Sequence, residues 1–253
     1  MKATYSVVIP VFNSETMIGE TVERVKSFFK NNEMLCEIIL VNDGSRDHSW
    51  DKIKSLALEN KNITSVNFVK NYGQHTAIFC GMQHAKGDFL ITLDDDLQNP
   101  PEEIGKLIKK INEGYDLVFA RFSEKKHSYT RRIGSRLIGF LNYIVYNKPR
   151  GITLSNFRIF TKEIVEKIKK LNVHYPYIPG LLLVNSERIA NVETKHEARR
   201  AGHSNYTFLK IFKLIWRMLF LNPVRSLRIL NFFGIKVSGE FVYRIMEIVP
   251  DGN

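Results

Sequence analysis

The sequence predicts an α/β fold in which a mainly parallel sheet carries helices on both faces. Short apolar runs recur along residues 1–120, and each is followed by a longer segment with helical periodicity. Such alternation is typical of β-α-β units. The runs are apolar throughout, as expected for strands that are buried on both faces. A length of 253 residues with 44% hydrophobic residues suffices for one large domain, or for a domain with an appendage.

The predicted elements follow one another from the amino terminus. The expected strands are 5–10, 37–41, 66–69, 89–93, 116–120, 154–160, 181–184 and 189–194. The expected helices run from a cap at Ser14 to about 31, and then over 47–60, 74–85, 101–114 and 162–171.

The most informative stretch is 89–102, FLITLDDDLQNPPE. It begins as a buried strand, continues into three carboxylates and ends at two prolines, which cannot continue a strand. The carboxylates are therefore expected at the carboxyl end of a central strand, where open α/β sheets bind ligands. Asp94 and Asp96 should point to one side, and Asp95 to the other. The three adjacent carboxylates repel one another unless a cation lies among them. Carboxylate oxygens are ligands that suit Mg²⁺ or Mn²⁺, and such an ion usually binds a substrate phosphate as well. A solvated acidic turn is the alternative, which the preceding buried strand disfavours.

Polar side chains follow the successive strands of the predicted sheet. Because the carboxyl ends of parallel strands meet at one edge, we expect these side chains to converge on one rim. They are Glu15, Asp43, Asn71, Asp94 and Asp96. Asp43 can accept hydrogen bonds from a ribose or from the N–H of a base, although it could also be a turn residue beside Gly44. The sequence contains no glycine-rich phosphate cradle, so metal and arginine are expected to meet a diphosphate.

Charge divides the chain into two unlike parts. Residues 1–120 hold 13 Lys and Arg against 17 Asp and Glu, whereas residues 121–253 hold 24 against 9. The second part is expected to contact an anion, which could be a phosphate, a nucleic acid or an acidic membrane surface. Arg132 and Arg136 lie one helical turn apart, with Ser135 between them. Together these side chains can bind a phosphate from one face of a helix, and a basic surface turn is the alternative.

The segment 208–221 is apolar but carries three cations on one helical face. It is too short and too charged to span a bilayer, and we interpret it as an amphipathic interfacial helix, with a core-packed helix as the alternative. Because the first strand is expected to begin at residue 5, no signal peptide is expected before it. Cys36 and Cys80 lie in apolar stretches and are expected to be free thiols in a reducing compartment.

Several motifs together resemble those of family-two glycosyltransferases, and among them the polyprenyl-phosphate glycosyltransferases, such as the undecaprenyl-phosphate formamidoarabinose transferases and the dolichyl-phosphate mannose synthases. The matching segments are SVVIPVFN (6–13), VNDGS (41–45), NYGQH (71–75), GDFLITLDDDLQNPPEE (87–103) and the late pattern within 199–206. The likeness covers about residues 4 to 235. It implies the glycosyltransferase A-type nucleotide-sugar fold, with a catalytic domain at 1–207 and an amphipathic, membrane-interfacial segment at 208–253.

The resemblance also implies roles for the matching residues. The donor nucleotide would be bound by Pro10, Asn13, Glu15, Asp43, Asn71, Gly73, Asp95 and Arg199. The metal, Mg²⁺ or Mn²⁺, would be held by Asp94, Asp96 and Gln98. The acceptor phosphate would be gripped by Arg121, Arg132 and Ser135. Asp94, Asp96 and Arg132 would form the catalytic set.

The implied reaction is the inverting transfer of a sugar from a nucleoside-diphosphate donor, UDP in preference to GDP, to a polyprenyl (undecaprenyl) phosphate. It would take place at the inner face of the cell membrane, for the synthesis or modification of a cell-envelope glycan. The acceptor is already an anion, with a second pKa of about 6, and needs no strong general base. Two features depart from the pattern: Ser155 and Asn156 stand where many relatives carry an acid, and close relatives continue into two transmembrane helices. The sequence leaves open whether a membrane partner or a homo-oligomer supplies an anchor.

Three other functions are alternatives for this sequence. A family-two transferase acting on a saccharide hydroxyl would need a carboxylate base in the second half of the chain. A nucleic-acid-binding protein would suit the basic half, but no binding motif is present and the acidic rim would have no purpose, so no nucleic acid is expected as a partner. An inactive scaffold is disfavoured by the intact Asp94-Asp95-Asp96 run.

Overall fold

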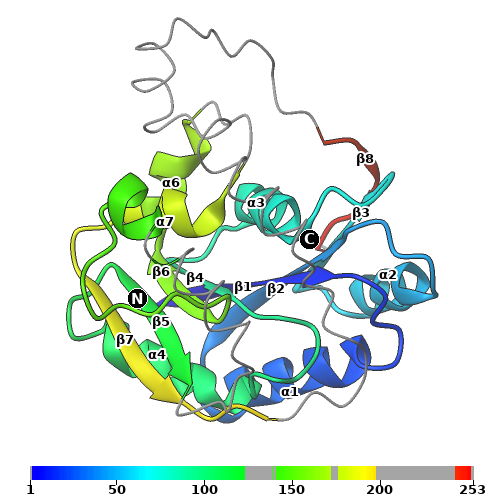
Figure 1. Ribbon diagram of the computed structural model, residues 1–253. Helices are drawn as coiled ribbons and strands as arrows, with labels where there is room; N and C mark the ends of the chain where they lie inside the picture. Colours follow the sequence, from blue (N-terminus) through cyan, green and yellow to red (C-terminus); the bar gives the residue numbers. More distant parts are fainter. Residues whose placement is uncertain (1, 123–138, 140, 172–175, 198–242, 252–253) are drawn as a thin grey trace, which may run out of the picture.

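The sheet at the centre of the fold positions everything else (Figure 1). The computed structural model describes residues 2–122, 139, 141–171, 176–197 and 243–251. Its described strands form one eight-stranded sheet in the order β7-β5-β6-β4-β1-β2-β3-β8. Their bounds are β1 Thr4–Val11, β2 Leu35–Asn42, β3 Ile63–Phe68, β4 Phe89–Thr92, β5 Leu117–Phe122, β6 Arg158–Thr161, β7 Ile189–Thr194 and β8 Ile245–Val249.

The pairing of the strands is mixed but mainly parallel. β1 pairs in parallel with β2 and β4, β2 with β3, and β5 with β7. β6 lies antiparallel between β4 and β5, and β8 lies antiparallel beside β3. The predicted α/β fold is confirmed. The carboxyl ends of β1 to β4 meet at one rim, as the alternation of strands and helices requires.

Helices cover both faces of the sheet. Their bounds are α1 Ile18–Asn31, α2 Ser49–Glu59, α3 Gln74–His84, η1 Pro101–Glu103, α4 Ile104–Ile111, α6 Lys162–Lys169 and α7 Ile178–Asn185. One apolar cluster joins one face to α1, α2 and α4, and a second joins the other face to α3, α6 and α7. In Figure 1, α3, α6 and α7 accordingly lie above the sheet, with α1 and α4 below it.

The predicted strand at 181–184 was wrong, because these residues belong to α7. Residues Ile178 to Leu183 are all buried, so the helix has no polar face and its sequence shows no helical periodicity. A short, wholly apolar run does not distinguish a buried strand from a buried helix. Proline lies near the start of this helix, where its fixed φ and missing N–H fit the first turn.

Three smaller expectations also differ from the structure. Of the predicted strand 154–160, only residues 158–160 are in a strand, as part of β6 (Arg158–Thr161). Ser14 does not cap α1 with its hydroxyl; its backbone carbonyl accepts from the N–H groups of Met17 and Ile18 instead. β8 was not predicted, and it lies within the sheet although the predicted interfacial segment 208–253 includes it. The boundary at residue 207 stays a prediction, since residues 198–242 lie outside the described part.

Two further predictions concern the thiols and the membrane. Cys36 and Cys80 are free thiols, partly buried and buried respectively, and burial raises the pKa of each. Among the residues that the structure describes, no helix has both the length and the apolar character that crossing a bilayer requires.

Candidate functional site

The carboxyl-end rim of the sheet gathers the polar residues that follow β1, β2 and β4. The Asp43 N–H donates to the Val11 carbonyl at 2.9 Å, which ties the end of β2 to the end of β1. The Leu93 N–H donates to the Val8 carbonyl at 3.2 Å, so β4 leaves the sheet beside β1 and delivers the acidic run to the same rim. The structure thus brings together the side chains whose convergence the strand order predicted.

Asp43 is buried and holds the loop that follows β3. One of its carboxylate oxygens accepts from the Tyr72 N–H at 2.7 Å, and the other accepts from the Gly73 N–H at 2.9 Å. Gly44 permits this approach: its φ is +65°, and a Cβ there would lie 2.5 Å from the Asn71 nitrogen. Burial raises the pKa of Asp43 to about 6, and the hydrogen bonds from the two N–H groups oppose this shift. Its contact with a ribose or base stays a prediction.

The turn between β1 and α1 is braced against the loop after β2 by two predicted donor-binding residues. The Oδ1 of Asn13, whose φ is +52°, accepts from the Arg46 N–H at 2.9 Å. The Oε2 of Glu15 accepts from the His48 N–H at 2.9 Å. Pro10 lies buried within β1. These bonds shape the far end of the rim, and the contacts of these residues with a nucleotide stay predictions.

The three adjacent carboxylates point in two directions, as the extended chain predicts. The Asp95 Oδ2 accepts from the Phe12 N–H at 3.1 Å and so faces the β1–α1 turn. The Asp94 Oδ1 accepts from the Gln74 amide at 2.5 Å, and the Asp96 Oδ1 accepts from the Gln98 N–H at 3.1 Å. Asp95 therefore holds the turn after β1, while Asp94 is directed toward the start of α3.

The electrostatics of this run favour a cation. Burial raises the pKa of Asp94 to about 6, with a further increase from the neighbouring Asp96, while Arg158, Gln74 and Asn156 lower it. Burial likewise raises the pKa of Asp95 to about 7. Charge repulsion of this kind is relieved when a divalent cation lies between the carboxylates.

Asp94 and Asp96 fit the ligand set of Mg²⁺ or Mn²⁺. No cluster of three or more His, Cys, Asp or Glu side chains arranged to hold a metal occurs among the described residues. Mg²⁺, however, is usually held by one or two carboxylates, with substrate phosphates and water completing its shell. Two carboxylates at an open rim therefore suit a metal that arrives with a diphosphate. The Gln98 side chain as a third ligand stays a prediction.

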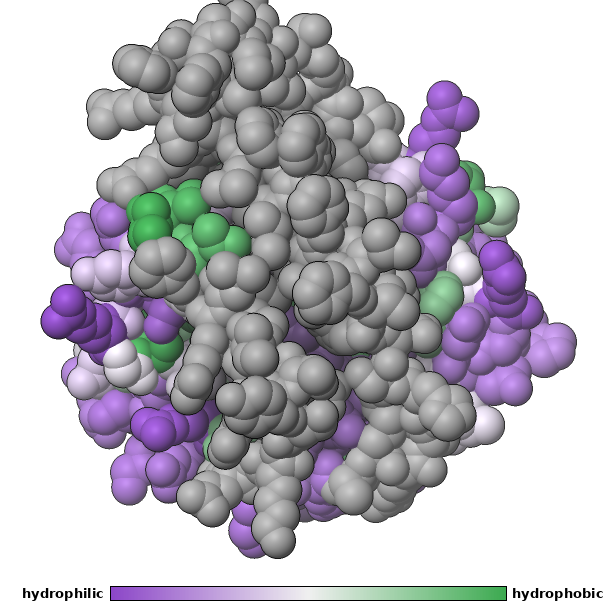
Figure 2. Space-filling model, in the orientation of Figure 1, coloured by the Kyte–Doolittle hydropathy of each residue, from purple (hydrophilic) through white to green (hydrophobic). Residues whose placement is uncertain are grey.

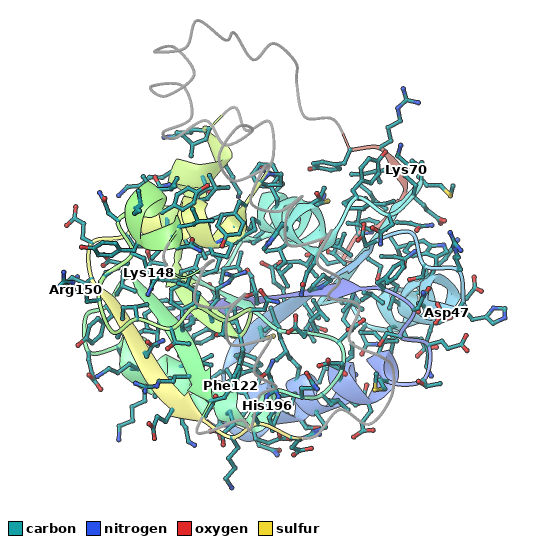
Figure 3. The ribbon with its side chains drawn as sticks, viewed as in Figure 1. Asp47, Lys70, Phe122, Lys148, Arg150 and His196 are labelled. Atoms are coloured by element: carbon teal, nitrogen blue, oxygen red, sulfur yellow. The ribbon has the colours of Figure 1, made fainter. Side chains whose placement is uncertain are left out.

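The segment after β7 contacts the loop that follows the acidic run, and the sequence did not predict this contact. The Glu197 N–H donates to the Gln98 carbonyl at 2.9 Å, and His196 Nδ1 lies 3.4 Å from Asn99 Oδ1. The rings of His196 and Phe122 are 4.6 Å apart, and Figure 3 shows them beside one another at the ends of β7 and β5. Neither residue type signals such a contact in the sequence, because it depends on the parallel pairing of β5 with β7.

The remaining predicted residues have different positions. Arg121 is exposed near the end of β5, where it pairs in register with Glu193. Asn71 is exposed in the loop that Asp43 holds. Arg132, Ser135 and Arg199 lie outside the described residues, so the acceptor-phosphate grip stays a prediction.

A buried arginine on β6 lies behind the acidic run and was given no role from the sequence. Arg158 is 0% exposed, and its Nε donates to the Thr92 hydroxyl at 3.1 Å. That hydroxyl donates in turn to the Asn156 carbonyl. Within the described part of the chain, the two terminal nitrogens of Arg158 have no hydrogen-bond partner. Burial lowers the pKa of Arg158 to about 10, and nearby Asp94 opposes this shift.

Comparisons with known proteins agree with this geometry. The chain is 35% identical over 247 residues to the undecaprenyl-phosphate 4-deoxy-4-formamido-L-arabinose transferase of Proteus mirabilis (strain HI4320), covering 96% of this chain and 76% of that protein. The fold is similar to glucosyl-3-phosphoglycerate synthase from Mycobacterium tuberculosis, solved with Mn²⁺, UDP and phosphoglyceric acid, with a TM-score of 0.63 at 19% identity over 94% of this chain and 81% of that one. It is also similar to S. aureus TarS in complex with UDP-GlcNAc, with a TM-score of 0.55 at 18% identity over 90% and 69% of the two chains. The model of the glycosyl transferase family 2 matches residues 6–169, and this chain therefore belongs to that family.

Proposed function

We propose that this glycosyltransferase transfers a sugar, with inversion, from a UDP-sugar to undecaprenyl phosphate in a metal-dependent reaction. The observation that carries the proposal is the run of three carboxylates that follows β4 at the rim, where Asp94 is bound by the Gln74 amide and Asp95 by the Phe12 N–H. The P. mirabilis relative, named for undecaprenyl phosphate, supports the acceptor. The mycobacterial neighbour, which holds UDP and Mn²⁺, supports the donor and the metal.

Asp94 and Asp96 would hold the divalent cation, which stabilises the negative charge of the departing diphosphate when it is bound. Asp43 keeps the loop of Tyr72 and Gly73 against the rim, where a nucleoside would lie. Buried and partly desolvated, these groups need little rearrangement when the donor binds, and their fixed positions favour reaction.

A phosphate acceptor agrees with the neutral residues beside the acidic run. Asn156 hydrogen-bonds to Gln74 at this place, and an amide cannot take a proton from an attacking hydroxyl. A phosphate monoester is already anionic near neutral pH and attacks without such help. A saccharide hydroxyl would need a carboxylate base that this position does not supply.

We further propose that the protein works at the inner face of an anionic cell membrane. Ile144 and Val184 are exposed by 52% and 43%, and the Arg150 guanidinium lies 5.9 Å from the ring centre of the half-exposed Tyr143. Figure 2 shows the described part of this face as mainly hydrophilic, with a hydrophobic patch where Figure 1 has α7. Apolar side chains beside cations are typical of surfaces that lie on anionic lipid.

The test is donor consumption across a panel of UDP- and GDP-sugars, with and without a short-chain polyprenyl phosphate and with Mg²⁺ or Mn²⁺. We expect release of UDP only when lipid phosphate and metal are both present. Asp96→Ala should lower turnover by at least about a hundredfold at saturating donor and metal. Asp88→Asn, at the opposite end of β4, is the matched control and should keep its turnover. Release that follows a saccharide acceptor, or near-normal turnover of Asp96→Ala, would contradict the proposal.

A further inference from the structure

A line of hydrogen bonds runs from the buried core to one oxygen of Asp94. The Arg158 Nε donates to the Thr92 hydroxyl, and this hydroxyl donates to the Asn156 carbonyl. The Asn156 amide nitrogen donates to the Gln74 Oε1 at 3.3 Å. The Gln74 Nε2 then donates to the Asp94 Oδ1 at 2.5 Å. Each group is held by the one before it, and the line begins at a guanidinium that is fully buried between strands.

The direction of the Gln74 amide follows from its neighbour. A glutamine amide has a donor end and an acceptor end, which exchange places when the amide turns over. The Asn156 nitrogen is a donor, so it faces the Gln74 oxygen and leaves the Gln74 nitrogen toward Asp94. An acceptor at position 156 would favour the opposite orientation, with the Gln74 oxygen against the carboxylate.

We infer that Gln74 and Asn156 are positioning residues, which occupy one oxygen of Asp94 and leave its other oxygen directed at the cation of the bound nucleoside diphosphate. The inference rests on the proposed function, because it takes Asp94 to be a metal ligand. Groups that orient metal-binding carboxylates commonly contribute about 10- to 100-fold to metal affinity. Neither residue would contact the substrate or the metal in this role.

The structure predicts an order of effects that a merely structural role would not give. Gln74→Ala removes the donor to Asp94 and should raise the dissociation constant for Mn²⁺ in the presence of UDP by about tenfold. Gln74→Met keeps the length of the side chain and adds no charge but cannot donate, so the dissociation constant should rise by a similar factor. Asn156→Ala removes the group that fixes the direction of the Gln74 amide and should raise the dissociation constant by a smaller factor.

The experiment titrates Mn²⁺ into the full chain with saturating UDP and follows the free Mn²⁺ signal by electron paramagnetic resonance. Gln83→Ala, an exposed glutamine near the other end of α3, is the matched control and should bind like the unaltered protein. Thermal unfolding without Mn²⁺ should be nearly unchanged in all the Gln74 variants, because Gln74 is exposed on the rim.

Asp94→Ala separates this inference from the proposed function. If Asp94→Ala abolishes Mn²⁺ binding while the Gln74 and Asn156 variants bind normally, the positioning role is wrong and the metal site stands. If Asp94→Ala itself binds Mn²⁺ normally, the proposed metal site fails. If Gln74→Met binds Mn²⁺ like the unaltered protein, the hydrogen bond from Gln74 to Asp94 is not what matters and the inference is overturned.

Discussion

At the scale of single residues, three consecutive carboxylates act in two directions. Asp95 accepts from the Phe12 backbone and fixes the turn after β1, while Asp94 accepts from the Gln74 amide of α3. Burial makes the ionised form of these carboxylates unfavourable in free energy, which is why the pKa values of Asp94 and Asp95 are raised. Asp43 carries a similar cost, which the two backbone N–H groups of the β3–α3 loop reduce.

Asp43 should make the free energy of unfolding depend on pH. Its pKa is about 6 in the folded protein and about 3.9 in an unfolded chain, so between these values the folded state holds a proton that the unfolded state has lost. Its contribution to stability is therefore fully present well below pH 4 and falls as the pH rises toward 6. Relative to Asp43→Asn, the unaltered protein should lose about 2 kcal/mol between pH 4 and pH 7. Urea unfolding of both proteins at the two pH values measures this difference, and an equal difference at both would contradict it.

At the scale of elements, loops that follow different strands depend on one another. The Gly44 turn lies against the backbone of Lys70 and Asn71, and this contact lets Asp43 reach Tyr72 and Gly73. The segment after β7 likewise binds the loop after Asp96 through the Gln98 carbonyl. The rim is thus held by contacts between loops as well as by the strands beneath them.

Gly44→Ala should destabilise the protein more than Gly151→Ala. Both glycines have positive φ, +65° and +81°, so each alanine incurs roughly 1 kcal/mol of backbone strain. A Cβ at Gly151 meets nothing within 4 Å, whereas one at Gly44 meets the backbone of Asn71 at 2.5 Å. The clash should add about 1–3 kcal/mol to the loss for Gly44→Ala. Urea unfolding of both variants measures the loss in free energy of unfolding. Equal losses for the two variants would contradict the predicted clash at Gly44.

At the scale of the whole molecule, the chain separates an acidic part from a basic part. The acidic rim follows β1 to β4, while the excess of Lys and Arg lies after residue 120. Figure 3 shows Lys148 and Arg150 on one side of the molecule, well away from Asp47 and Lys70. A donor complexed with a cation suits the first part, and an anionic acceptor in a membrane suits the second.

The protein should bind vesicles that contain phosphatidylglycerol and ignore vesicles of pure phosphatidylcholine. Arg150→Ala should weaken this binding by about fivefold, since a cation near an anionic surface contributes about 1 kcal/mol. Lys61→Ala, which removes an exposed cation between α2 and β3, is the matched control and should have no effect. Sedimentation at low and high salt measures both variants. Binding that is indifferent to lipid charge and to salt would refute the membrane contact.

The sequence by itself determined the alternation of strands and helices, the place of the acidic run and the opposite directions of Asp94 and Asp95, because these depend on local periodicity and on the geometry of an extended chain. The tertiary structure decided what periodicity does not encode. Residues 178–183 of α7 are all buried and show no helical pattern, and β8 is recognised by its pairing with β3. Gln74 comes from α3, whereas Asn156 and Arg158 come from β6 and the residues just before it, and packing of α3 and β6 against β4 brings them close to Asp94.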